Sequence, residues 1–312
     1  MKITLEEMCD ELQKVNRVVV AGHVIPDGDA VGSALALAMI LKSIGKDVRV
    51  MFDDNIPRNF MMMPTCETIE RPSEKIDVDA LVIVDTAPDR IGRVLECVGD
   101  VPILNIDHHV SNSGENRKLF CDPHAAATAE IIFEIAIELG IKLTKDFAVC
   151  VYVGIATDTG FFQFSNTTAE TLLIASDMLA LGVKPNLVVE VLERRPREVV
   201  EGLGKALNTL EVWHDGKAAG IFIDPDLSST LETTEGFIDQ IRVIEGVDIS
   251  LVLKCKAENV CRVSMRSKTI DVSQIALKFD GGGHIRAAGC TLKMPFEDAK
   301  RTIMQAIDDA LN

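Results

Sequence analysis

Short apolar runs alternate with longer helix-like segments over the first 185 residues of the chain. Four runs rich in Val, Ile and Leu are predicted strands: Arg17–Gly22, Asp47–Phe52, Ala80–Asp85 and Pro102–Asp107. Two helices are predicted, Gly32–Ser43, which Gly45 would end, and Thr128–Leu139, whereas the apolar segment Phe147–Thr157 fits either type. Because the strands are unbroken apolar runs, we expect an α/β domain at 1–185, with a parallel sheet and helices on both faces.

The pattern changes beyond this domain. Residues 186–210 are charged, lack strand character and contain Pro196, so we predict a helical linker there. Residues 211–312 are expected to form a second, smaller α/β domain. Its predicted strands are Ala218–Ile223, Ile249–Lys256 and Arg262–Arg266, and its predicted helices are Thr233–Ile244, Val272–Phe279 and Phe296–Leu311.

Composition narrows the possible classes of function. The net charge of -16 argues against a protein that coats long nucleic acid, because such binding needs Lys and Arg along the phosphates. No apolar run approaches the ~18–20 residues of a membrane span, and the polar, acidic segment 1–17 does not fit a secretory signal. The eight cysteines form no C-x-x-C pair, which favours reduced thiols without a disulfide framework. We therefore expect a cytoplasmic protein with no membrane partner.

Histidine and aspartate residues stand where four of the predicted elements end. They are His23, Asp27 and Asp29 after the first strand, Asp85 at the third, Asp107, His108 and His109 at the fourth, and Asp158 after the apolar segment of open type. The carboxyl ends of parallel strands share one edge of a sheet, so these side chains are expected to converge. Asp29 alone could simply cap the following helix, but four segments ending alike favour a metal site. The mixed set suits Mn²⁺ better than Ca²⁺, and its size favours two ions.

Five segments resemble, in order, the motifs of a known family. GHVIPDGDAVGS, VIVDTAP, NIDHH and ATDTGFF are similar to the four motifs of the DHH phosphoesterases. GGGHIRAAG is similar to the signature of the DHH-associated C-terminal domain. The resemblance spans nearly the whole chain. The two-domain size of the chain is similar to that of the proteins in one branch of the family, the nanoRNases, pAp phosphatases and stand-alone dinucleotide phosphodiesterases.

The resemblance implies that six of these side chains are ligands of two metal ions that share Asp85. One set is His23, Asp27 and Asp85, and the other is Asp29, Asp85, His108 and Asp158. Asp107 would orient the histidine pair, and His109 would contact the substrate phosphate and help to protonate the leaving group. The family resemblance further implies that a hydroxide held between the ions near Asp85 attacks phosphorus in line.

A glycine-rich segment lies in the one basic region of this acidic chain. Between residues 251 and 290, seven Lys or Arg face three Asp or Glu. Consecutive glycines let the backbone approach an anion closely, although such a stretch by itself would be a plain loop. The resemblance implies that this region holds the nucleotide part of the substrate across a cleft from the metals. The residues expected there are Arg266, Gly282, Gly283, His284 and Arg286, with Arg266 the best candidate to grip phosphate.

Together these features predict an Mn²⁺-dependent phosphoesterase acting on short nucleotides. Its expected substrates are pAp, linear dinucleotides such as pApA and pGpG, and RNAs of a few nucleotides. The alternative is a phosphodiesterase of cyclic dinucleotides, while a family II inorganic pyrophosphatase or a non-catalytic nucleotide sensor fits less well. The order of preference among these substrates stays open. So does a homodimer, in which the linker helix could pack between two copies.

Overall fold

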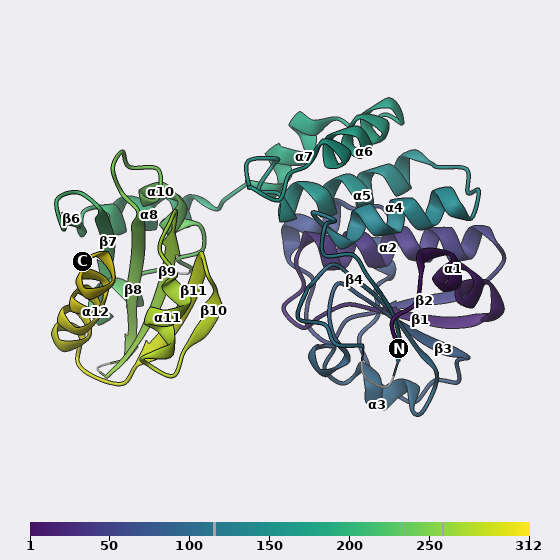
Figure 1. The fold of residues 1–312 in the computed structure, drawn as a ribbon, viewed down its shortest axis with the longest axis horizontal. Coiled ribbons are helices and arrows are strands. Elements are labelled where there is room, and N and C mark those ends of the chain that lie inside the picture. Colours follow the sequence, from purple (N-terminus) through teal and green to yellow (C-terminus); the bar gives the residue numbers. More distant parts are fainter. Residues whose placement is uncertain (115–116, 232, 258) are drawn as a thin grey trace. The chain divides into compact units, whose positions relative to one another are not determined.

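The chain forms two compact units, residues 1–194 and 195–312, which are described separately below. The computed structural model describes residues 1–114, 117–231, 233–257 and 259–312, without the side chains of 256 and 257. Figure 1 shows the ribbon of each unit. Both are mixed α/β structures, as expected from the sequence.

The first unit is built on a five-stranded parallel sheet, which confirms the predicted fold class. Its strand order is β2-β1-β3-β4-β5. The strands are β1 (Arg17–Ala21), β2 (Asp47–Met51), β3 (Ala80–Val84), β4 (Ile103–Asp107) and β5 (Lys118–Cys121). The apolar pattern does not predict β5, because this edge strand of four residues has only one buried side chain, Leu119.

Helices cover both faces of this sheet, unequally. On one face lie α1 (Leu5–Lys14), α2 (Gly28–Ser43) and α4 (Thr128–Glu138), and further out lie α5 (Lys145–Asp158), α6 (Ala169–Ala180) and α7 (Pro185–Leu192). The other face is covered by the short helix α3 (Val94–Val98), whose Val94 and Val98 pack against Val19 and Leu81. The sheet alternates accordingly, with Val18 and Val20 on the α2 side and Val19 on the α3 side.

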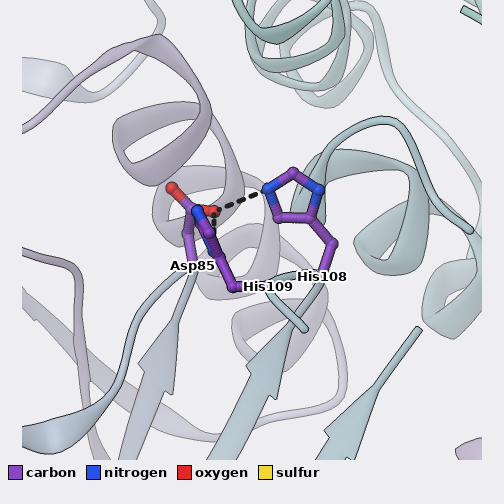
Figure 2. A group of neighbouring side chains, drawn as sticks. All are labelled: Asp85, His108 and His109. Carbon is purple, nitrogen blue, oxygen red and sulfur yellow. Dashed lines mark ion pairs between the residues drawn. The ribbon is translucent and has the colours of Figure 1, made fainter. Parts of the chain in front are cut away.

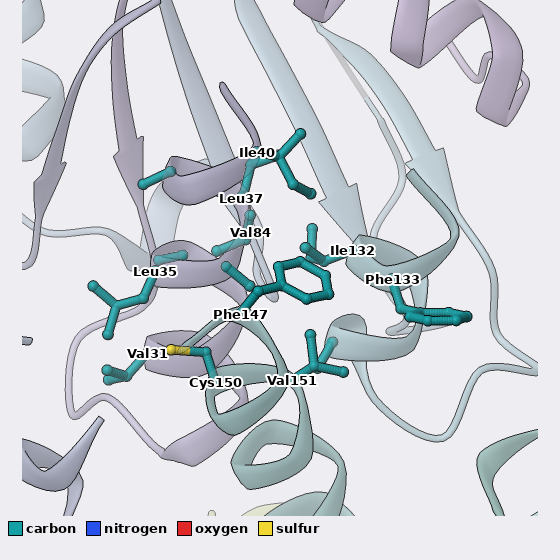
Figure 3. Close-up of a cluster of buried hydrophobic side chains, with 14 of the residues drawn as sticks. Val31, Leu35, Leu37, Ile40, Val84, Ile132, Phe133, Phe147, Cys150 and Val151 are labelled. Carbon is teal, nitrogen blue, oxygen red and sulfur yellow. The ribbon is translucent and has the colours of Figure 1, made fainter. Parts of the chain in front are cut away.

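The segment whose type the sequence left open is the helix α5, and it packs on α2, α4 and α6. It is apolar all round because helices surround it. Figure 3 shows Phe147 and Val151 of α5 among the side chains of this core, together with Leu35 of α2 and Ile132 of α4.

Two glycines let α5 lie unusually close to its neighbours. A Cβ on Gly32 would collide with the carbonyl oxygen of Cys150, and one on Gly154 would lie 2.6 Å from the Cβ of Ala129. The same Cβ on Gly154 would lie 2.9 Å from Oδ1 of Asp29. This close packing brings Asp158, the last residue of α5, to the edge of the sheet where Asp29 lies.

The second unit has a six-stranded mixed sheet in the order β10-β11-β9-β8-β7-β6. The strands are β6 (Leu210–Trp213), β7 (Ala218–Ile223), β8 (Ile249–Ala257), β9 (Val260–Ser267), β10 (Gly282–His284) and β11 (Ala287–Leu292). The helices are α8 (Arg197–Leu207), α9 (Pro225–Ser229), α10 (Phe237–Ile241), α11 (Val272–Leu277) and α12 (Phe296–Leu311). Helices α11 and α12 cover one face, whereas α8 and α10 cover β7 and β8 on the other, which leaves exposed side chains such as Arg262, Ser264 and Thr291 on β9 and β11.

Two expectations about the second unit are wrong. The helix predicted at Thr233–Ile244 is confined to Phe237–Ile241, because Gly236 at its start has a left-handed φ of 74° that no helix continues through. Cys255 and Cys261, expected to be reduced, form a disulfide. They lie directly opposite each other on β8 and β9, a pairing that depends on strand register and that residue spacing alone does not reveal.

The segment expected as a linker contains two helices that belong to different units. Helix α7 lies in the first unit and α8 in the second, with Pro196 between them. Within the described residues no single helix is long and apolar enough to cross a membrane. Helices α6 and α7, bent by 104° at their junction, meet that length and composition only as a pair.

Candidate metal centre

The histidines and aspartates singled out in the first unit converge at the carboxyl edge of its sheet. Nε2 of His23 lies 3.4 Å from Oδ2 of Asp27 and 3.5 Å from Oδ2 of Asp85. Nε2 of His108 lies 3.5 Å from Oδ1 of Asp85 and 3.3 Å from Oδ2 of Asp158. Among the described residues, three groups therefore offer ligand atoms within 4.8 Å of one another: His23 with Asp27 and Asp85, Asp29 with His108 and Asp158, and Asp85 with His108 and His109. Asp85 belongs to the first and third of these groups and contacts His108 of the second.

Asp27, and not Asp29, caps the following helix. α2 begins at Gly28, four residues before the predicted start, and Oδ1 of Asp27 accepts a hydrogen bond of 2.9 Å from the amide of Ala30. The other oxygen of Asp27 is the one near His23. Asp29 lies in the first turn and is fully buried, so the simple capping role does not explain it.

Asp85 occupies the centre of the cluster in a left-handed backbone conformation. Its φ of 61° is uncommon for a residue with a side chain, and aspartate and asparagine tolerate this region better than most. Its amide donates to the carbonyl oxygen of Ile106 on β4, 3.0 Å away. Figure 2 shows dashed lines that run from His108 and from His109 to its carboxylate. Such strained residues are concentrated at functional sites.

The two adjacent histidines have different partners. Nδ1 of His108 contacts the carbonyl oxygen of Ala125 at 3.2 Å, which turns Nε2 toward Asp85 and Asp158. Nδ1 of His109 contacts Oδ1 of Asp107 at 2.8 Å, and its ring is more exposed than that of His108. Within the described part of the chain, Asp107 bonds to His109 and not to the ring of His108, so the expectation that it orients the pair is narrowed to His109.

Asp107 is part of a buried polar network that the sequence pattern does not predict. Nδ2 of Asn112 donates to Oδ2 of Asp107 at 2.6 Å and to Oδ1 of Asn105 at 2.9 Å. Nε of Arg117 also donates to Oδ1 of Asn105, at 2.9 Å. The available signal was Asn105 itself, since an asparagine inside an otherwise apolar strand must find buried partners.

The cluster carries more negative charge than its histidines can balance. Burial, followed by the charges of Asp29 and Asp85, raises the pKa of Asp158 to about 10. Burial also raises the pKa of Asp29, and burial with the charge of Asp29 raises that of Asp85. Burial by itself would lower the pKa of His23, but Asp27 and Asp85 outweigh it and raise that pKa to about 10.

These features fit a divalent metal. Nε2 of His108 is buried and has no hydrogen-bond partner among the described residues, although two carboxylates face it. A cation there would supply that partner and offset the repulsion between the carboxylates. Imidazole and carboxylate together are ligands suited to first-row divalent ions.

In the second unit, the expected substrate residues lie on β9 and β10 and in the turn between β10 and β11. Strand pairing sets Arg266 opposite Ala287, and Ala287 opposite His284, so Arg266 and His284 lie in one row across β9, β11 and β10. Gly283 must be glycine, with a φ of 141° and no room for a Cβ beside the carbonyl oxygen of Ala287, whereas a Cβ on Gly282 would meet nothing within 4 Å. Arg286 lies near Asp271, whose pKa is lowered by the Ser273 hydroxyl and, to a lesser degree, by the Arg286 charge.

This fold, with histidines and carboxylates gathered at one sheet edge, and the match to a known family identify a metal-dependent phosphoesterase, a hydrolase. The chain belongs to the DHH family: residues 17–155 match the DHH family N-terminal domain, and residues 223–312 match the DHHA1 domain.

The chain is similar to proteins named for the hydrolysis of nucleotides and to a solved structure of the same fold. It is 35% identical, over 94% of its length and 90% of the other protein, to the bifunctional oligoribonuclease and PAP phosphatase NrnA of Thermus thermophilus. It is 26% identical to the cyclic-di-AMP phosphodiesterase PdeA of Listeria monocytogenes, over 98% of this chain but only 50% of that protein. An exopolyphosphatase-related protein from Bacteroides fragilis has the same fold, with a TM-score of 0.89 at 24% identity, covering 98% of this chain and 95% of that one.

Proposed function

We propose that this protein is a cytoplasmic phosphoesterase of short nucleotides. It removes the 3′-phosphate of pAp and hydrolyses linear dinucleotides such as pApA and pGpG and RNAs of a few nucleotides. The convergence of six histidine and aspartate side chains at one sheet edge carries the proposal for the reaction. The names of the relatives, above all the one from Thermus thermophilus, support this choice of substrates.

Two Mn²⁺ ions are proposed as the resident metals. One would be held by His23, Asp27 and Asp85, and the other by Asp29, Asp85, His108 and Asp158. When bound, two such ions supply a nucleophile from water and neutralise charge on the phosphoryl oxygens. The protein's own side chains bind and orient the substrate and deliver a proton to its leaving group.

His109 is the residue proposed to deliver that proton. Its Nδ1 is committed to Asp107, which leaves Nε2 of a partly exposed ring available to the substrate. The hydrogen bond to Asp107 raises the pKa of His109 against the opposing effect of burial, and so favours the protonated, donating form.

Asp107→Asn is expected to lower kcat by ~10–100-fold, because it removes the carboxylate that orients and charges His109. The pKa of His109 should fall, so the alkaline limb of the kcat profile should move to lower pH. Profiles recorded at saturating metal and substrate test this, with Asp100→Asn, an exposed aspartate before β4, as the control. An alkaline limb that stays in place would remove His109 from the role of acid.

Arg266 and Gly282 are proposed to contact the nucleotide. Arg266→Ala should raise KM by ~10–100-fold and leave kcat nearly unchanged, as expected for a lost charged hydrogen bond. Gly282→Ala should fold normally, since its Cβ meets open space, and should also raise KM by obstructing the backbone. Arg301→Ala, which removes an exposed arginine from α12, is the matched control. A KM equal to that of the control would exclude either residue from the site.

One reconstitution experiment tests the proposed reaction. Metal-stripped protein is given Mn²⁺, Mg²⁺ or no metal and incubated with pAp, pApA, pGpG, cyclic di-AMP, pyrophosphate and a long RNA. We expect Mn²⁺-dependent products from pAp and the linear dinucleotides, with little from the long RNA. Activity on pyrophosphate alone, or none after metal addition, would overturn the proposal.

The second candidate is hydrolysis of cyclic di-AMP. The similarity to PdeA of Listeria monocytogenes favours it, although the chain spans only half of that protein. Turnover of cyclic di-AMP in the same assay, without turnover of pAp or pApA, would establish this alternative.

We also propose a homodimer that forms through α6 and α7. Leu172 and Leu173 on α6 and Leu187 on α7 are 53%, 61% and 49% exposed, and a second copy of the chain could cover them. Light scattering should give the mass of two chains, and Leu173→Lys should reduce it to one, whereas Lys substituted for the isolated exposed Val260 on β9 should not. A monomeric wild-type protein would contradict the dimer.

A further inference from the structure

The turn that leads into α4 contacts three of the candidate ligands, Asp29, Asp85 and His108. Ala127, at the start of this helix, provides no side-chain cap. The first free amides of α4 are used by Asp29 instead. Thr128 donates its amide to Oδ2 of Asp29 at 2.6 Å, and Ala129 donates to Oδ1 at 2.9 Å.

Thr128 contacts a second ligand through its side chain. Its hydroxyl donates to Oδ1 of Asp85 at 2.9 Å, so one residue bonds to Asp29 and Asp85 together. Thr128 is fully buried, and so are both carboxylates. These two carboxylates carry like charges, which burial makes harder to hold side by side.

The neighbouring residues of this turn contact His108 directly and the backbone of Asp158 through Asn166. The carbonyl oxygen of Ala125 accepts a hydrogen bond from Nδ1 of His108. The amide of Ala126 donates to the buried Glu130 at 3.1 Å, which fixes the turn to α4. Nδ2 of Asn166 bridges the carbonyl oxygens of Ala126 and Asp158, each at 3.1 Å.

The hydrogen bonds also fix how many lone pairs each carboxylate has left. Asp29 accepts three bonds, from the amides of Thr128 and Ala129 and from the Ser33 hydroxyl at 3.0 Å, and so retains one of about four acceptor positions. Asp85 accepts one from Thr128, which leaves Oδ2 and part of Oδ1 for metal. The remaining lone pairs would therefore let Asp29 bind one metal ion and let Asp85 bind two.

We propose that Thr128, which is not itself a ligand, is the positioning residue that fixes Asp29 and Asp85 relative to each other and so sets the spacing of the two metal positions. The inference rests on the proposed dimetal function. A residue that only fills space would act through its methyl group, whereas Thr128 is proposed to act through its hydroxyl, which bonds to Asp85.

Two variants separate the hydroxyl from the shape of the side chain. Thr128→Val keeps the shape and loses the hydroxyl, whereas Thr128→Ser keeps the hydroxyl and loses the methyl group. Calorimetric titration of the metal-stripped proteins with Mn²⁺ measures affinity without any nucleotide. We expect Thr128→Val to weaken Mn²⁺ binding by ~10–100-fold, the usual effect of losing a group that orients a ligand. Thr128→Ser should stay within about threefold of the wild type.

Two further measurements test whether the loss of the hydroxyl acts only through metal binding. At saturating Mn²⁺ the KM of Thr128→Val for pApA should equal that of the wild type, and the electron paramagnetic resonance signal of coupled Mn²⁺ pairs should change in Thr128→Val alone. If Thr128→Val does not fold, the pair Thr128→Ser and Thr128→Ala, which differ only by the hydroxyl, gives the same comparison.

Equal Mn²⁺ affinity in the hydroxyl-free variant and the wild type would overturn the inference, as would equal losses in Thr128→Ser and Thr128→Val. A wild-type protein that binds Mn²⁺ but hydrolyses none of the nucleotides would reject the proposed substrates and leave the positioning result standing. A wild-type protein that binds no divalent ion would overturn both.

Discussion

Replacing Asp85 by asparagine is expected to lower kcat at least ~1000-fold while the protein stays folded. Asp85 belongs to both proposed ligand sets, so its loss affects both proposed metal positions. Metal ions contribute several kcal/mol to stabilising phosphoryl-transfer transition states, and each ~1.4 kcal/mol corresponds to a factor of ten in rate.

Asparagine is chosen because the variant is expected to fold like the wild type. Asparagine tolerates the left-handed φ of 61° at this position, and its amide oxygen can still accept the hydroxyl of Thr128. It also removes a buried charge that Asp29 repels, so the metal-free variant should melt no lower than metal-free wild type.

Activity and melting temperature, measured with and without Mn²⁺, check this prediction. The control is Asp89→Asn, which changes an exposed aspartate four residues further along the chain. Retained activity in Asp85→Asn would exclude Asp85 as a shared ligand. Loss of activity together with an unchanged rise in melting temperature on adding Mn²⁺ would place its role outside metal binding.

The second large effect is expected in the metal-free protein, whose melting temperature should fall by about 5 °C or more as the pH rises from 5 to 9. Asp158 has a pKa raised to about 10 in the folded chain, by burial and then by Asp29 and Asp85. A carboxyl group with a raised pKa stabilises the fold while it is protonated. That contribution is complete below its ordinary pKa near 3.8 and is lost as the pH rises toward 10.

Other titrating groups do not reverse this trend. His23, with a pKa raised to about 10, loses its stabilising charge over the upper part of the same range. Carboxylates with lowered pKa values, such as Asp79 beside Arg17, change charge below the range. Bound Mn²⁺ takes the place of the protons, so the metal-loaded protein should show a weaker dependence.

Melting curves across this pH range, in chelator and in Mn²⁺, measure the effect. Asp158→Asn should flatten the metal-free profile, while Asp177→Asn, an exposed aspartate on α6, should leave it unchanged. A metal-free protein whose stability is flat or rises over this range would show that the buried carboxylates are not the source of the excess charge.

Four of the five strands of the first sheet, and the gathering of the candidate ligands at its edge, could be predicted because both signals are local. Unbroken apolar runs identify β1 to β4, and Asp85 and His108 stand directly at or beyond the ends of such runs. Parallel pairing then brings these ends together without further information. The family of the chain could be predicted for the same reason, since its motifs are these loop segments.

What could not be predicted depends on contacts between distant residues. Thr128 lies 43 positions from Asp85 and 99 from Asp29, and nothing in the sequence around it differs from an ordinary helix start. The Cys255–Cys261 disulfide requires the register of β8 and β9. The placement of α5 on other helices follows from the small size of Gly32 and Gly154, which matters only once two surfaces meet.

The close packing of α5 has a consequence for how this site can diverge. Asp85 and the histidines after β4 are anchored to a hydrogen-bonded ladder of strands, which permits few alternative geometries. Asp29 and Asp158 are carried by helices that meet through glycines, so a single added methyl group at Gly154 would move one carboxylate without altering the sheet. In evolution or in the laboratory, metal spacing and metal preference are therefore expected to change first through residues of this helix interface, with every ligand retained.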